Sequence, residues 1–143
     1  MSPMDQFKTR DKANEGVRIP LSKPGGAPTE HWLIVRSAWS DEFQFARNAM
    51  FRDAVEESKA VSCAPEAEQG KLRREFDRKR RAKAVAALIA EWSFDETECS
   101  EQSKIDFLLD APQVLAMVEH IAEDDKRFFG QGWTSSSSGE KQK

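Results

Sequence analysis

The side chains that stand out chemically form a basic run, KLRREFDRKRRAK, over residues 71–83. It holds eight Lys/Arg against Glu75 and Asp77, a net charge of +6. Cations at this density are able to contact the phosphates of DNA, because each contact releases condensed counterions. The same run is also typical of a docking surface for an acidic partner, or of a solvated helix face whose long stems cover apolar neighbours. The basic candidates are Arg73, Arg74, Arg78, Lys79, Arg80 and Arg81.

Residues 91–125 carry the opposite charge, with eleven Asp/Glu against Lys104 and a net charge of −10. The whole chain has a net charge of −3, and no helix-turn-helix spacing surrounds the basic run. Its own acidic segment is therefore one candidate partner for that run. We keep a small nucleic-acid-binding regulator as the alternative function, behind the docking surface and the solvated face.

Catalytic and metal-binding patterns find little support in this sequence. The softer metal ligands are scattered, at His31, Cys63, Cys99 and His120, and no pair has zinc-ligand spacing. Gly25-Gly26 lacks the Lys-Ser/Thr of a phosphate loop, and no serine has the setting of a nucleophile elbow. We expect no enzymatic activity, no metal and no cofactor. Two cysteines without a disulfide framework favour a reducing cytoplasm, and no apolar run of about 18 residues predicts a membrane span.

The elements that position these residues begin with a β-hairpin. Val17, Ile19 and Leu21 alternate with other residues at the period of a half-buried strand. SKPGGAP over residues 22–28 is turn chemistry, and HWLIVR over residues 31–36 is rich in β-forming residues. The pattern predicts a hairpin over residues 17–36. Two strands alone are marginally stable, so this hairpin must lie on helices or pair with another subunit.

Two long helices are expected next. Ser40 is a good N-cap for a helix to about residue 59, in which Phe45 lies off the face of Phe43 and Met50 and indicates a second contact surface. The second helix is expected over about residues 71–92. Its Phe76 and Val85 lie on opposite sides, which predicts two packing partners or a bend near Arg80.

The remaining chain is expected to be helical up to Gly130, with residues 61–70 and 93–100 as connectors. Ser100 is placed to cap a short helix, and Pro112 lies in the first turn of the next helix, for which Gly130 is the expected C-cap. The fold class predicted is mainly α (α+β), with four to five helices and an N-terminal hairpin. We expect residues 1–130 to form a single domain that includes the hairpin 17–36, and residues 131–143 to form a disordered polar tail.

The last helix ends on Phe128-Phe129, whose directions differ by about 100°. We therefore expect at least one of these rings to lie outside a one-sided core. The apolar residues considered as partner contacts are Phe45, Trp92, Phe128 and Phe129. The unpaired hairpin edge and the split apolar stripes also predict self-association.

The stretch LIAEWSFDETECSEQSKIDFLLDAPQVLAMVEHIAEDDKRFF resembles the tail assembly chaperones of long-tailed bacteriophages. The similar features are a Trp taken to close a helix, a Phe two residues later, a polar link to a capped helix, a Pro-started helix and a closing Phe pair. NEGVRIPLSKPGGAPTEHWLIVRS is similar to the hairpin of one branch of that family, so the resemblance covers about residues 14–129. Cys99-Ser-Glu-Gln departs from the family's Thr-rich link with Glu-Asn.

This resemblance implies a helical protein that self-associates and coats the tape measure protein until the major tail (tube) protein polymerises around it. In many members of that family a ribosomal frameshift adds a second domain, and in this protein such a longer form would be the one that recruits the tube protein. It also implies a location in the host cytoplasm and absence from the mature virion. Chemically the role is coherent, because a helical chaperone with apolar stripes is able to cover the helical seams of a tape measure protein.

Overall fold

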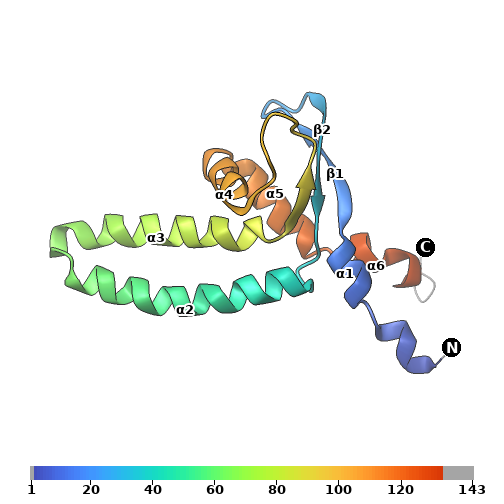
Figure 1. Cartoon of the computed structure of the whole chain (residues 1–143), viewed down its shortest axis with the longest axis horizontal. Helices are drawn as coiled ribbons and strands as arrows, with labels where there is room; N and C mark the ends of the chain where they lie inside the picture. Colours follow the sequence, from blue (N-terminus) through green and yellow to red (C-terminus); the bar gives the residue numbers. More distant parts are fainter. Residues whose placement is uncertain (1, 134–143) are drawn as a thin grey trace.

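A computed structural model describes residues 2–133, which form a body of short elements and a long helical hairpin (Figure 1). The elements are η1 (Pro3–Phe7), α1 (Arg10–Glu15), β1 (Val17–Ser22), β2 (Pro28–Val35), α2 (Asp41–Cys63), α3 (Glu66–Ala86), β3 (Ile89–Trp92), α4 (Glu101–Asp110), α5 (Pro112–Ala122) and α6 (Asp125–Trp133). The predicted class, mainly helical with an N-terminal hairpin, is confirmed.

The predicted hairpin is the first part of a three-stranded antiparallel sheet in the order β1-β2-β3. Val17 pairs with Val35 and Ile19 with Leu33, and the register shifts between Pro20 and Ser22. Leu33 and Val35 are fully buried because alternate residues of β2 point into the core. The sheet is therefore one wall of the body and packs on helices, which is one of the two arrangements expected for a hairpin of marginal stability.

A single hydrophobic core joins the sheet to most of the helices. Its buried members come from α1, all three strands, the end of α3, and α4 to α6: Ala13, Ile19, Leu33, Val85, Ile89, Leu108, Val118 and Phe129 are examples. The predicted caps support this arrangement, since the hydroxyls of Ser40 and Ser100 accept hydrogen bonds from the backbone N–H groups of Phe43 and Ser103.

The two longest helices, α2 and α3, lie antiparallel and project away from the body; we call them the arm (Figure 1). Val61 is the only fully buried residue of α2. By contrast, α3 buries Ala82, Val85 and Ala86 in the core at its C-terminal end. The predicted division of this helix between two neighbours is therefore confirmed: it packs on α2 along the arm and on α4 and α5 at its end.

The long second helix was expected to reach residue 92, and that prediction is wrong. The helix ends at Ala86, and Ile89–Trp92 form β3 against β2. The free edge of β2 provides backbone partners that a continued helix would leave unused, including a 2.6 Å hydrogen bond from the Arg36 N–H to the Leu88 carbonyl. Trp92 consequently ends a strand and not a helix. The expected connector over residues 61–70 is also much shorter, because only Ala64 and Pro65 separate α2 from α3.

The end of the chain differs from the prediction in two ways. One continuous final helix was expected, but α5 stops at Ala122 and α6 starts at Asp125. Gly130 is not a C-cap, because α6 continues through it to Trp133, and the positive-φ glycines of the described chain are Gly16 and Gly26. The first three residues of the predicted tail are thus helical. Its remainder, residues 134–143, lies outside the described residues.

Candidate protein-docking surface

The arm exposes large apolar side chains that the body does not cover. On α2, Phe45 is 73% exposed and Phe51 and Val55 are each 58% exposed. Phe51 and Val55 are four residues apart and therefore share one side of the helix. Phe45 points about 80–120° away from them around the helix, so the three residues do not share one face. We call them the exposed apolar residues of α2.

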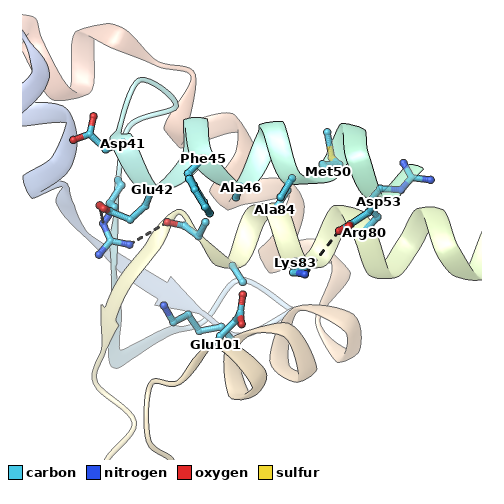
Figure 2. A pocket seen from close by; sticks show the side chains of 15 residues that line it. Asp41, Glu42, Phe45, Ala46, Met50, Asp53, Arg80, Lys83, Ala84 and Glu101 are labelled. Carbon is cyan, nitrogen blue, oxygen red and sulfur yellow. Dashed lines mark hydrogen bonds and ion pairs between the residues drawn. The ribbon is translucent and has the colours of Figure 1, made fainter. Parts of the chain in front are cut away.

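A groove of about 700 Å³ lies between α2, α3 and the start of α4, and Phe45 lines it whereas Phe51 and Val55 do not. Its floor includes the small side chains Ala46, Ala49, Ala84 and Ala87. Phe45 extends from α2 at the mouth of the groove (Figure 2). Small floor residues leave room for the larger side chains of an incoming helix, which is the arrangement that helix-in-groove recognition uses.

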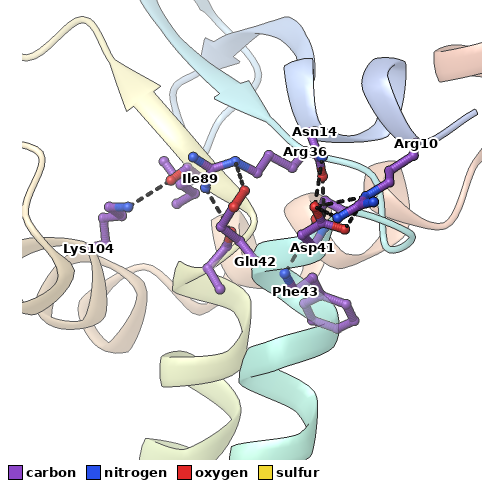
Figure 3. Close-up of polar contacts among 10 residues, drawn as sticks. Arg10, Asn14, Arg36, Asp41, Glu42, Phe43, Ile89 and Lys104 are labelled. Carbon is purple, nitrogen blue, oxygen red and sulfur yellow. Dashed lines mark hydrogen bonds and ion pairs between the residues drawn. The ribbon is translucent and has the colours of Figure 1, made fainter.

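Charged residues of both signs form the rim of the groove. Arg36 donates from Nη1 to the Ala87 carbonyl at 3.0 Å, and its Nε lies 3.4 Å from a Glu42 carboxylate oxygen. That buried Nε has no hydrogen-bond partner among the described residues, because the contact with Glu42 is an ion pair without hydrogen-bond geometry. Lys104 donates to the Ile89 carbonyl at 2.8 Å, and burial lowers the pKa of its amine (Figure 3). The rim therefore offers polar contacts around an apolar floor.

The start of α2 is fastened to α1 by a polar cluster (Figure 3). Arg10 makes a two-pronged contact with the Asp41 carboxylate, at 3.0 Å from Nε and 2.9 Å from Nη2. The Asn14 side chain accepts a 2.8 Å hydrogen bond from the Asp41 N–H and donates to its carboxylate at 3.1 Å. The hydrogen bonds from Arg10, and next those from Asn14, lower the pKa of Asp41. This cluster fixes the direction in which the arm leaves the body.

The structure divides the basic run into bound and free cations. Arg80 bonds to Glu57 and Asp77, Arg81 bonds to Glu119, and Lys83 lies 3.8 Å from Asp53. The remaining cations of the run are exposed and form no ion pair within residues 2–133: these are Lys71, Arg73, Arg74, Arg78 and Lys79. Of the six basic candidates, Arg73, Arg74, Arg78 and Lys79 are thus available to a partner.

The apolar candidates also divide. Phe45 is exposed, whereas Trp92 and Phe128 are 7% exposed and Phe129 is 4% exposed. The expectation that one ring of the Phe pair lies outside the core is wrong. Because α6 lies against α1, the core surrounds this helix on more than one side and accepts both rings. These three aromatic residues stabilise the fold, and they do not form an exposed patch.

Sequence reasoning singled out Phe45 but not the other exposed apolar residues, which in and next to the arm are Phe51, Val55 and Trp39, the last of them 60% exposed. The signal for the first two was present, since their four-residue spacing falls outside the stripe of Phe43, Met50 and Ala54. Trp39 gave no such signal. It precedes α2, and its indole N–H donates to Asp125 at 3.1 Å.

No three His, Cys, Asp or Glu side chains within residues 2–133 lie close enough together to hold a metal ion. Across this part of the chain, none of the helices has the length and apolar character needed to cross a membrane. Comparison of the sequence and the fold with protein-family models, curated proteins and solved structures gave no match.

Proposed function

We propose that this protein is a phage tail assembly chaperone, which binds and solubilises the tape measure protein and promotes assembly of the tail tube around it. The sequence resemblance described above motivates the proposal. The observation that carries it is the arm, whose 23-residue helix α2 buries one residue fully while it exposes Phe45, Phe51 and Val55. An exposed Phe at a groove with an apolar floor fits the helix-in-groove mode of recognition.

The proposed contact is a helix of the tape measure protein lying in the groove, with a second segment of that protein against Phe51 and Val55 on the other side of α2. The larger apolar side chains of the first helix occupy the space above the alanine floor, and Phe45 covers one side of it. Covering one exposed Phe contributes about 1.5–3 kcal/mol, which changes an affinity about tenfold or more. A long partner offers many such seams, so several copies act along it.

The rest of the proposal follows the same resemblance. The protein self-associates, acts in the host cytoplasm and is absent from the mature virion, and a frameshifted longer form recruits the tube protein. Binding of this kind requires neither a catalytic residue nor a cofactor.

Co-expression with a candidate tape measure protein tests the proposal. Phe45→Ser combined with Phe51→Ser should lower the yield of soluble tape measure protein severalfold and leave the circular dichroism spectrum of the chaperone unchanged. Both side chains are more than half exposed, so their loss leaves the fold intact.

A matched control replaces equally exposed apolar residues elsewhere. Met4 and Phe7, in η1, are 68% and 67% exposed, and Met4→Ser with Phe7→Ser should leave the soluble yield unchanged. Equal yields from wild type and the Phe45/Phe51 variant would refute the proposed docking surface. Equal losses in both double variants would show that general surface hydrophobicity, and not the arm, is responsible.

A further inference from the structure

A second concave surface, of about 380 Å³, lies where the end of β3 meets α4. Trp92, Phe94 and Phe107 form its walls. Their ring centroids lie 5.4, 5.8 and 5.5 Å apart pairwise, and each pair meets edge to face. This packing holds the rings in fixed orientations, and we call the space they line the aromatic pocket.

Carboxylates surround this pocket, and its lining contains no cation. Glu96, Asp106 and Asp110 line it, and all three are exposed. None of them forms an ion pair within the described part of the chain, and Asp106 only accepts a 2.9 Å hydrogen bond from the Gln102 amide. Aromatic faces and carboxylates both attract a guanidinium or ammonium group. The chemistry of the pocket therefore fits an Arg or Lys side chain.

The arm carries a surface of the opposite charge. Lys71, Arg74 and Arg78 follow at spacings of three and four residues, so they form one stripe on α3, about 10 Å long. All three are exposed and lack an ion pair within residues 2–133. The arm projects beyond α4 and α5 (Figure 1). Arg78 lines a cavity with Leu108 and Pro112 of its own chain, but none of the three side chains lines the aromatic pocket of its own chain.

We propose that the protein assembles head to tail, with the basic stripe of one copy bound at the aromatic pocket of the next. The complementary charges and the projection of the arm select a second copy as the occupant. Because the two surfaces differ, the contact repeats from copy to copy and builds a ring or an open chain. The inference specifies the contact through which the self-association in the proposed function occurs.

Sedimentation velocity on the purified full chain, up to about 100 μM, tests this contact without any tape measure protein. Glu96→Lys with Asp110→Lys, and separately Arg74→Glu with Arg78→Glu, should each weaken self-association about tenfold or more. An equimolar mixture of the two variants should recover association between them, because the unchanged stripe of the first variant then meets the unchanged pocket of the second. Raising the salt from about 0.05 M to about 0.5 M should weaken the wild-type contact.

Matched controls make the same changes of charge elsewhere. Glu15→Lys with Glu123→Lys, and Arg73→Glu with Lys79→Glu, should retain wild-type association, since these residues lie outside the pocket and the stripe. Phe94→Leu keeps every charge and should still weaken association about three- to tenfold through loss of the ring face. A wild-type monomer over the whole concentration range, or association that survives both charge reversals, overturns the proposal. Either result leaves the co-expression test of tape measure binding unaffected.

Discussion

Arg80 of α3 reaches across the arm to Glu57 of α2, with its Nε 2.6 Å from the carboxylate and both side chains 21% exposed. This contact joins the two helices of the arm. The hydrogen bond to Glu57 is the main reason that the pKa of Arg80 is raised, and the hydrogen bond to Asp77 raises it further. One of the most conspicuous cations of the basic run thus stabilises the arm and is not offered to a partner.

Glu57→Gln should therefore destabilise the protein by about 1–2 kcal/mol, because it leaves a largely buried guanidinium with Asp77 as its one remaining charge partner among the described residues. Urea denaturation followed by circular dichroism measures this change. Glu56 provides the neighbouring control: its ion pair with Lys59 is 3.4 Å long and its partners are 75% and 69% exposed. Glu56→Gln should change stability by less than about 0.5 kcal/mol. Equal effects at both positions would show that Glu57 has no special role in the arm.

Phe129→Ala should destabilise the protein by about 3–5 kcal/mol, because it removes a ring that is buried in the core. Phe45→Ala should remain within about 0.5 kcal/mol of wild type, since most of that side chain is already in water. Thermal melts of the two variants compare an aromatic residue of the core with one of the arm. A Phe129 variant that melts with wild type would place α6 outside the cooperative core.

Because of Lys104, the free energy of unfolding should depend on pH in the alkaline range. Burial lowers its pKa in the folded state below the ordinary 10.5. Between the lowered pKa and 10.5, the unfolded state binds more protons than the folded state, so this residue makes stability increase as the pH rises through that window. Lys104→Met removes the effect.

The measurement is the free energy of unfolding of both proteins at about pH 7 and about pH 10. The value for wild type minus the value for the Met variant should be larger at the higher pH. A difference that stays constant or decreases would contradict a lowered pKa. The Met variant also serves as the control for other alkaline transitions, because both proteins share them.

Local signals in the sequence were sufficient for the hairpin and for most helix starts. Alternation around Ile19 and the turn residues near Gly26 predicted β1 and β2, and the hydroxyls of Ser40 and Ser100 cap the helices that they were expected to cap. These features depend on residues close to one another in the chain. They are therefore readable without knowledge of the tertiary structure.

Features that depend on distant neighbours were not readable. The run from Leu88 to Trp92 fits the end of an amphipathic helix as well as a short strand, and the free edge of β2 decides between them. The two closing Phe rings diverge on a helical wheel, yet α1 supplies a second wall for α6 and both are buried. Whether a cation of the basic run forms an ion pair likewise depends on acids elsewhere in the fold, such as Glu57 and Glu119.

The last prediction concerns the alternative function, nucleic-acid binding by the basic run. Five of its cations are free of ion pairs within residues 2–133, whereas Arg80, Arg81 and Lys83 would have to leave acidic partners to contact phosphate. Five phosphate contacts give a slope of at most about −4.5 in a plot of log affinity against log salt. We therefore expect binding weaker than about 1 μM at about 0.15 M salt, with no preference among duplex sequences.

Fluorescence anisotropy with two unrelated duplexes of about 20 base pairs measures both quantities. Arg73→Glu with Lys79→Glu separates the two functions, because these residues are exposed but lie outside the stripe of Lys71, Arg74 and Arg78. Under the chaperone proposal, this variant keeps its self-association and its yield of soluble tape measure protein. Submicromolar binding to one duplex that this variant abolishes, combined with an unchanged tape measure yield in the Phe45/Phe51 variant, would favour the regulator over the chaperone. The salt dependence of binding also distinguishes the two functions, since phosphate contacts weaken steeply with ionic strength and apolar contacts of the arm do not.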